Sequence, residues 1–166
     1  SMIDYDKITK EGLASNSKHI TVIGAGLIGV EVAENLKEAG KEVTLIEGDN
    51  QILTMWQQKF GNFAETVLKE KGIEVLTSSL VSEFELDENW KINGIKIKDG
   101  ANIKTDFVIL SVGIKPNTDL LLENGAEHIG NGALKVNERM ETSIKDVFAA
   151  GDNVAIKNSQ TNQFDY

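Results

Sequence analysis

The chain has 166 residues, no cysteine and a formal net charge of -9, with 40% hydrophobic and 26% charged residues. This size and apolar content predict one globular domain, and the acidic balance, with lysines scattered among acids, argues against a nucleic-acid partner. Without cysteine there is no disulfide, thiolate nucleophile or sulfur ligand, and His19 and His128 are too few and too scattered for a metal site.

The N-terminal segment carries no targeting pattern. No apolar run approaches the roughly 20 residues that cross a bilayer, and the charged-then-apolar order of a signal peptide is missing. We therefore expect a cytoplasmic protein that does not act at a membrane. Ser1 and Met2 are interpreted as an expression scar and a start residue, and residues 1–18 as this scar with a short helix over residues 5–15.

Predicted strands and helices alternate from residue 19 onward. β-branched apolar runs predict strands at 19–24, 42–47 and 73–76, and apolar residues at helical spacing predict helices over 27–39 and 57–71. Strands that alternate with helices of this length imply right-handed crossovers. The predicted fold is therefore α/β, with a Rossmann-like doubly wound parallel sheet.

The pattern changes after residue 80. Alternating apolar and polar residues over 80–105 predict an inserted antiparallel β-meander, and 107–113 is again a buried strand. A short helix over 118–125 and strands at 133–136 and 146–149 follow.

A glycine-rich segment lies between the first predicted strand and helix. Gly24, Gly26 and Gly29 form G-x-G-x-x-G, in which the first glycine permits a tight turn, the second admits a pyrophosphate to the backbone, and the third allows close packing of helix on strand. The helix N-terminus supplies free N–H groups and partial positive charge. Glu47 ends the next strand, where a carboxylate can accept ribose hydroxyls. Together these features predict a dinucleotide-binding site.

Charge favours NAD over NADP at this site. A 2′-phosphate would meet Glu47 and Asp49, and the chain has no Lys or Arg between them and Lys59. Like charges about 4 Å apart cost roughly 4 kcal/mol at an effective dielectric near 20. FAD uses the same fingerprint, so the pattern alone leaves NAD and FAD open.

Four segments carry a family resemblance: "GAGLIGVE", "VTLIE", "VILSVGIKPNTDLL" and "TSIKDVFAAGD", in that order. They resemble the flavin-dependent pyridine nucleotide-disulfide oxidoreductases, particularly the NADH oxidase, NADH peroxidase and coenzyme A-disulfide reductase branch. The resemblance covers residues 19 to about 154 and is similar to the middle third of such an enzyme. It implies an NAD(H)-binding Rossmann-type domain at 19–154 and a truncated C-terminal segment at 155–166.

The resemblance also implies partners that this sequence lacks. In that family an N-terminal domain binds FAD and carries the redox cysteine, and a C-terminal domain forms the dimer. We therefore expect this chain to be an excised domain that positions NADH for hydride transfer to FAD, and to be inactive by itself. The final electron acceptor depends on the absent cysteine and is left open.

The family's site residues transfer to this sequence by position. By resemblance, Glu31 would lie near the nicotinamide; its alternative is an acid in the first helical turn stabilised by the helix dipole. Val112 and Gly113 would approach the nucleotide, or simply form a buried strand end. Gly151 and Asp152 resemble the second flavin fingerprint, which holds FAD. The pyrophosphate would be held by the following residues: Gly24, Gly26, Leu27, Ile28 and Gly29, with Glu47 on the adenosine ribose.

One position departs from the family and two other functions remain. Leu27 stands where this branch usually has Tyr or Phe, which puts gating by an aromatic ring in doubt. A stand-alone nucleotide-sensing regulatory domain is disfavoured by the flavin fingerprint at Gly151 and Asp152. A complete small dehydrogenase is disfavoured because the sequence shows no Tyr-x-x-x-Lys pair or catalytic histidine.

Overall fold

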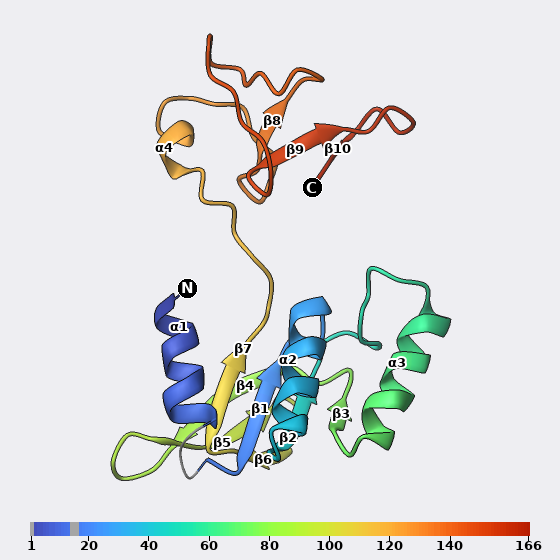
Figure 1. The fold of residues 1–166 in the computed structure, drawn as a ribbon, viewed down its shortest axis with the longest axis vertical. Coiled ribbons are helices and arrows are strands. Elements are labelled where there is room, and N and C mark those ends of the chain that lie inside the picture. Colours follow the sequence, from blue (N-terminus) through green and yellow to red (C-terminus); the bar gives the residue numbers. More distant parts are fainter. Residues whose placement is uncertain (1, 14–16) are drawn as a thin grey trace. The chain divides into compact units, whose positions relative to one another are not determined.

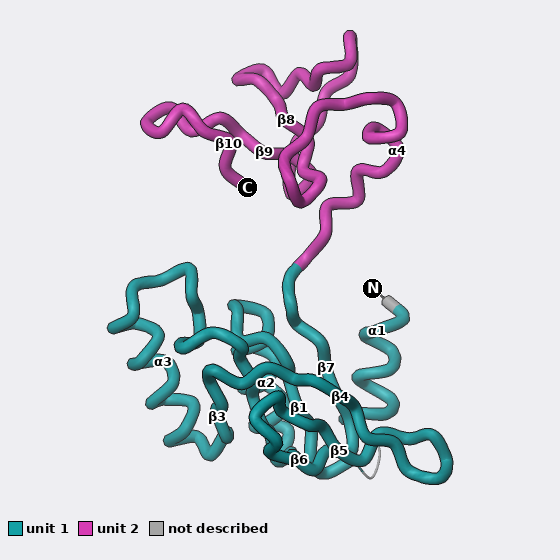
Figure 2. Tube along the Cα trace, turned by 180° about the vertical axis from the view of Figure 1, so that it is seen from behind, with its two compact units in different colours: residues 1–113 teal, residues 114–166 magenta. Residues whose placement is uncertain are grey.

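The computed structural model describes residues 2–13 and 17–166. The chain divides into two compact units, Ser1–Gly113 and Ile114–Tyr166 (Figure 2). Ser1 of the expected scar and residues 14–16, which include the end of the predicted first helix, lie outside the described residues. The expected limits at 19 and 154 do not coincide with this division, and the extent of the NAD(H)-binding domain stays a prediction.

The first unit contains a four-stranded parallel sheet with the order β3-β2-β1-β7 (Figure 1). Helix α2 (Leu27–Glu38) connects β1 to β2, and α3 (Gln58–Glu70) connects β2 to β3. This arrangement confirms the predicted Rossmann-like parallel sheet. Its strands are β1 (His19–Ile23), β2 (Glu42–Ile46), β3 (Glu74–Leu76) and β7 (Phe107–Leu110).

The two faces of this sheet are covered by different kinds of structure. Ile20, Val22 and Leu45 face a core shared with Leu36 of α2 and Leu68 of α3. The opposite face packs on the predicted meander, now observed as an antiparallel sheet in the order β4-β5-β6. Contacts on that side join three sheet residues and two meander residues: Ile23, Ile46 and Val108 with Ile95 and Ile97. The meander strands are β4 (Val81–Leu86), β5 (Ile92–Ile97) and β6 (Asn102–Lys104).

The N-terminal helical segment begins earlier than the periodicity predicted. An α-helix, α1 (Met2–Lys7), continues into a π-helical segment, η1 (Ile8–Leu13). Ile8 packs against the helix-side core, and Gly12 is buried close to the ring of Phe107. This contact joins η1 to the outer strand of the sheet.

The second unit is small and mostly irregular. It contains α4 (Asp119–Leu122) and a three-stranded sheet with the order β10-β9-β8. The strand predicted at 146–149 is wrong: the segment forms only an isolated bridge between Glu141 and Phe148, because Asp146 adopts a left-handed φ of 63° that interrupts the extended run. The strands are β8 (Leu134–Val136), β9 (Val154–Lys157) and β10 (Phe164–Asp165).

Among residues 2–13 and 17–166, no helix combines the length and the apolar character that a membrane span requires.

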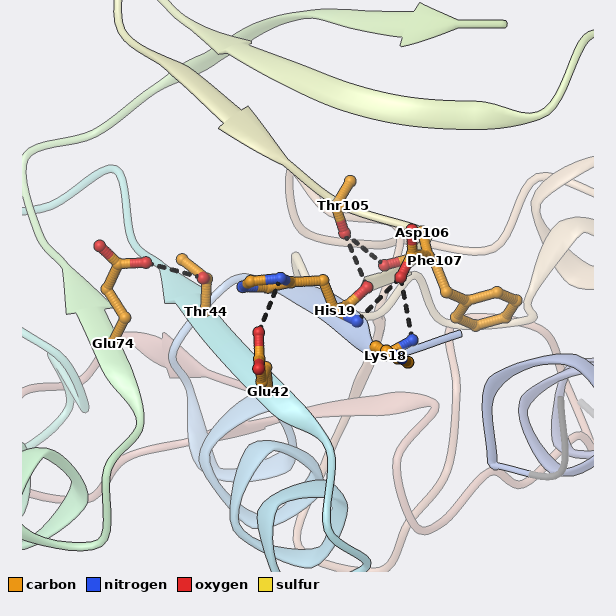
Figure 3. A network of polar contacts seen from close by, with 8 residues as sticks. All are labelled: Lys18, His19, Glu42, Thr44, Glu74, Thr105, Asp106 and Phe107. Carbon is orange, nitrogen blue, oxygen red and sulfur yellow. Dashed lines mark hydrogen bonds and ion pairs between the residues drawn. The ribbon is translucent and has the colours of Figure 1, made fainter. Parts of the chain in front are cut away.

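A polar network fastens the amino ends of the central strands (Figure 3). The Asp106 carboxylate accepts the backbone N–H groups of Lys18 and His19 at 2.9 and 3.0 Å. The buried Thr105 hydroxyl donates to the carbonyl oxygen of Phe107 at 2.9 Å, with the His19 carbonyl oxygen 3.3 Å away. The entrance of β1 is therefore bonded to the residues that lead into β7.

The polar network continues from β1 to β2 and β3. His19 Nδ1 lies 3.0 Å from a carboxylate oxygen of Glu42. The Thr44 hydroxyl donates to the Glu74 carboxylate at 2.9 Å, which links β2 with β3 (Figure 3).

Asp106→Asn tests this edge. The backbone N–H of His19, aided by that of Lys18, holds the pKa of the Asp106 carboxyl below its ordinary 3.8. A folded-state pKa below the unfolded value stabilises the protein above the unfolded pKa, and this stabilisation is lost as pH falls through the folded pKa. At pH 7 we expect the variant to lose about 1 kcal/mol or less, because the carboxylate is largely exposed. Urea unfolding between pH 3 and 7 should show this difference shrinking below about pH 4, whereas a constant difference would contradict the argument.

Thr21 offers a second test of the fold. Among the described side chains, its Oγ1 atom is buried without a hydrogen-bond partner. Thr21→Val replaces this hydroxyl by a methyl group, and we expect about 1 kcal/mol of added stability in urea unfolding, because the desolvation cost disappears. The matched control, Thr105→Val, removes a hydroxyl that donates a hydrogen bond and should lose about 1 kcal/mol. Equal losses in both variants would show that the Thr21 hydroxyl has a partner.

Candidate functional site

The glycine segment lies at the carboxyl edge of the parallel sheet, in the turn from β1 to α2 (Figure 1). The Gly24 N–H donates to the Ile46 carbonyl oxygen at 2.8 Å, and the Ser111 N–H donates to that of Ile23 at 2.7 Å. With the strand order β3-β2-β1-β7, β2 and β3 are added on one side of β1 and β7 on the other, so the topological switch point of this parallel sheet lies between β1 and β7. Ligands of open α/β sheets bind in the crevice at such a point.

The three glycines occupy three different steric environments. Gly24 has φ +96°, and a Cβ there would lie 2.3 Å from the Ser111 carbonyl oxygen. A Cβ on Gly29 would lie 1.9 Å from the Gly24 carbonyl oxygen, so any side chain would push α2 off the turn. A Cβ on Gly26 would meet nothing within 4 Å. Two of the glycines are thus required by packing, whereas Gly26 leaves open space at the mouth of the helix.

The N-terminus of α2 faces this open space with free amide groups. Gly26 is the N-cap residue, and the Val30 N–H makes the first backbone bond of the helix, to the Gly26 carbonyl oxygen at 3.0 Å. The earlier N–H groups, those of Leu27, Ile28 and Gly29, have no intrahelical acceptor. Such a helix terminus carries about half a positive charge and is suited to an anion.

Glu47 lies beside this turn, and its carboxylate bonds to the turn directly. Its Oε2 atom accepts the Ala25 N–H at 2.7 Å, and its Oε1 atom accepts the Asp49 N–H at 3.1 Å. The Glu47 side chain is half-buried, so it points neither fully into solvent nor into the closed interior of the protein. The bond to Ala25 was not foreseen from the sequence, although parallel pairing of β1 and β2 makes the ends of these strands neighbours.

A second contact holds the same peptide from the other side. The Ala25 carbonyl oxygen accepts the Leu53 N–H at 2.9 Å, and Ala25 is fully buried. Leu53 is buried with a left-handed φ of 52°, which is unusual for a leucine. Sequence reasoning missed this contact because Ala25 stands at an unspecified position of the fingerprint and Leu53 lies outside it.

Three other predicted residues lie near or beyond the sheet edge. Glu31 is exposed and lies in the second turn of α2, so the alternative that places it in the first helical turn is wrong. Val112 is 71% exposed and follows the end of β7 at Leu110, so the alternative of a buried strand end is also wrong. Gly113 has φ +106°, a conformation that favours glycine.

Gly151 and Asp152 belong to the second unit, so the structure groups the predicted residues in two sets. Both residues are exposed, and the Tyr166 hydroxyl donates to the Asp152 carbonyl oxygen at 3.1 Å. They line a hollow of about 290 Å³ together with Ile114, Val154 and Tyr166. Among the described residues of both units, no group of three or more His, Asp or Glu side chains could hold a metal ion.

Comparisons with known proteins agree with this fold. The family model described as pyridine nucleotide-disulphide oxidoreductase matches residues 2–164. The NADH oxidase of Enterococcus faecalis (strain ATCC 700802 / V583) is 38% identical over 144 residues, which make up 86% of this chain and 32% of that protein. The water-forming NADH oxidase from Lactobacillus brevis, solved bound to NADH, has a TM-score of 0.89 at 31% identity, over 100% of this chain and 36% of its own.

A further solved structure is an FAD-dependent pyridine nucleotide-disulphide oxidoreductase from Desulfovibrio vulgaris. It has a TM-score of 0.84 at 30% identity, over 97% of this chain and 41% of its own. The chain spans about a third of the length of the curated NADH oxidases that it resembles, at 32% and 38%. On the match to its family model and on these relatives, the chain belongs to the pyridine nucleotide-disulphide oxidoreductase family.

Proposed function

We propose that the first unit binds NAD(H) and positions it for hydride transfer to FAD within a longer flavin-dependent oxidoreductase. The observation that carries the proposal is the open space over Gly26, at the amide-lined mouth of α2 and beside the Glu47 carboxylate. A pyrophosphate fits this space because no side chain occupies it and the helix terminus favours negative charge. Hydride transfer itself is the chemistry of the cofactors.

The role of each residue follows from its place in this site. The amides of Leu27 and Ile28 would donate to the pyrophosphate oxygens. Glu47 would accept the adenosine ribose hydroxyls through lone pairs that its two backbone bonds leave free, since a carboxylate has about four acceptor positions. Glu31 would lie near the nicotinamide, and the backbone of Val112 and Gly113 would approach the bound nucleotide.

The second unit would contribute to flavin binding in the longer enzyme. Gly151 and Asp152 are exposed beside a hollow in that unit, which suits a role in holding the FAD chain. We further propose an NAD(H)-binding domain at 19–154, a cytoplasmic location, and a longer enzyme that acts as an NADH oxidase, NADH peroxidase or coenzyme A-disulfide reductase. Missing FAD-binding and dimerisation domains would make the isolated chain inactive.

Discrimination between NADH and NADPH tests the proposal. Because Glu47 and Asp49 would repel a 2′-phosphate, titration calorimetry should show NADH binding at least about tenfold more tightly than NADPH. Glu47→Gln removes one of the two negative charges and should reduce the difference in affinity between NADH and NADPH. Equal affinities of the unchanged chain for the two nucleotides would contradict the charge argument, and no binding of either would contradict the proposal.

A pair of glycine substitutions separates folding from binding. Gly26→Ala adds a methyl group in open space, so we expect the unfolding midpoint to stay close to that of the unchanged chain while NADH binding falls about tenfold or more, because the methyl group occupies the pyrophosphate position. Gly29→Ala should destabilise the fold by several kcal/mol, since its methyl group would overlap the Gly24 carbonyl oxygen. Calorimetry and urea unfolding measure the two effects, and unchanged NADH affinity in Gly26→Ala would contradict the placement of the pyrophosphate.

A further inference from the structure

The Ala25 peptide is held from both sides by groups that follow β2. Its N–H donates to Glu47 Oε2 at 2.7 Å, and its carbonyl oxygen accepts the Leu53 N–H at 2.9 Å. We infer that Glu47 and Leu53 clamp this peptide and thereby fix the glycine turn in the conformation that opens Gly26 to a diphosphate. For its ligand, the inference rests on the proposed function.

The bond from Glu47 is of the strong kind. A carboxylate that accepts a backbone N–H makes a charge-assisted hydrogen bond, which is shorter and stronger than a neutral one. Ala25 is fully buried, so loss of this acceptor would leave a buried N–H unsatisfied. The bond between Glu47 Oε1 and the Asp49 N–H fixes the carboxylate in the orientation that reaches Ala25.

The contact from Leu53 is maintained by packing. A left-handed backbone is unfavourable for leucine, and such a conformation persists only where its surroundings impose it. Here the Leu53 side chain is buried in the core that also contains Leu68 of α3. α3 also lies close to the segment that contains Ile52 and Leu53: a Cβ on Gly61 would lie 2.8 Å from the Ile52 carbonyl oxygen. The connection between β2 and α3 therefore supports the glycine turn.

This clamp predicts that Glu47 affects the binding of both the ribose and the diphosphate of an adenosine diphosphate. If Glu47 served only the ribose, its removal would weaken only ligands that have ribose hydroxyls. If it also holds Ala25, its removal weakens a diphosphate that it never touches, because the turn loses its fixed shape. Glu47 is then a positioning residue for the pyrophosphate as well as a ligand of the sugar.

The distinguishing probe is 2′,3′-dideoxyadenosine diphosphate, which keeps the diphosphate and lacks both ribose hydroxyls. In titration calorimetry we expect Glu47→Ala to weaken this probe about tenfold. Glu47→Gln keeps one acceptor oxygen and should give an intermediate loss. The matched control is Glu42→Ala, the same change at the opposite end of β2, which should leave the affinity unchanged. Unchanged affinity for the probe in Glu47→Ala, together with weaker binding of ADP, would overturn the inference.

Amide hydrogen exchange in the unliganded chain gives a second readout. We expect the Ala25 amide to exchange at least about tenfold faster in Glu47→Ala than in the Glu42→Ala control, with circular dichroism confirming that both variants are folded. Equal exchange rates would overturn the inference even if NADH binds. Faster exchange in a chain that binds neither NADH nor the probe would support the clamp and refute the proposed function, so the two failures are distinguishable.

Discussion

The close approach of α2 to the ends of β1 and β7 is the constraint on which the site depends. It exists because Gly29 has no side chain to meet the Gly24 carbonyl oxygen, and Gly24 has none to meet that of Ser111. Because α2 packs so closely on the turn, its free amides lie at the carboxyl edge of the sheet, where their partial positive charge faces an open space. Any larger residue at either position would raise the helix and remove that geometry.

The parallel sheet determines much of the remaining fold. A parallel sheet is stable only when both of its faces are covered. Here α2, α3 and η1 cover one face, and the antiparallel meander packs on the other. The meander thus takes the place that helices have on the second face of a doubly wound sheet, which explains why its inner residues, Ile95 and Ile97, are buried.

The polar network and the glycine turn lie at opposite ends of the strands of the first unit. The amino edge carries a polar network around Asp106 and Thr105 that ties β1 to the entrance of β7. The carboxyl edge carries the glycine turn, where the Ala25 peptide bonds to Glu47 and Leu53 while the space over Gly26 stays open. This chain contains no cysteine, so in the proposed longer enzyme it would supply positions for the cofactors, and the hydride transfer would be the chemistry of those cofactors.

The sequence by itself determined the features that local patterns encode. Periodicity predicted the alternation of strands and helices and the meander, and the spacing of Gly24, Gly26 and Gly29 predicted the turn between β1 and α2. The strand prediction failed at 146–149, where the left-handed backbone of Asp146 interrupts a run that has strand composition.

Only the tertiary structure decided which distant groups meet. The bond from Ala25 to Glu47 and the support from Leu53 join segments that are far apart in the sequence, and no periodicity or motif specifies them. The same holds for Asp106, which caps the start of β1 through strand pairing that brings β7 beside it. Such contacts depend on strand order and packing, and these are properties of the whole fold rather than of any local segment.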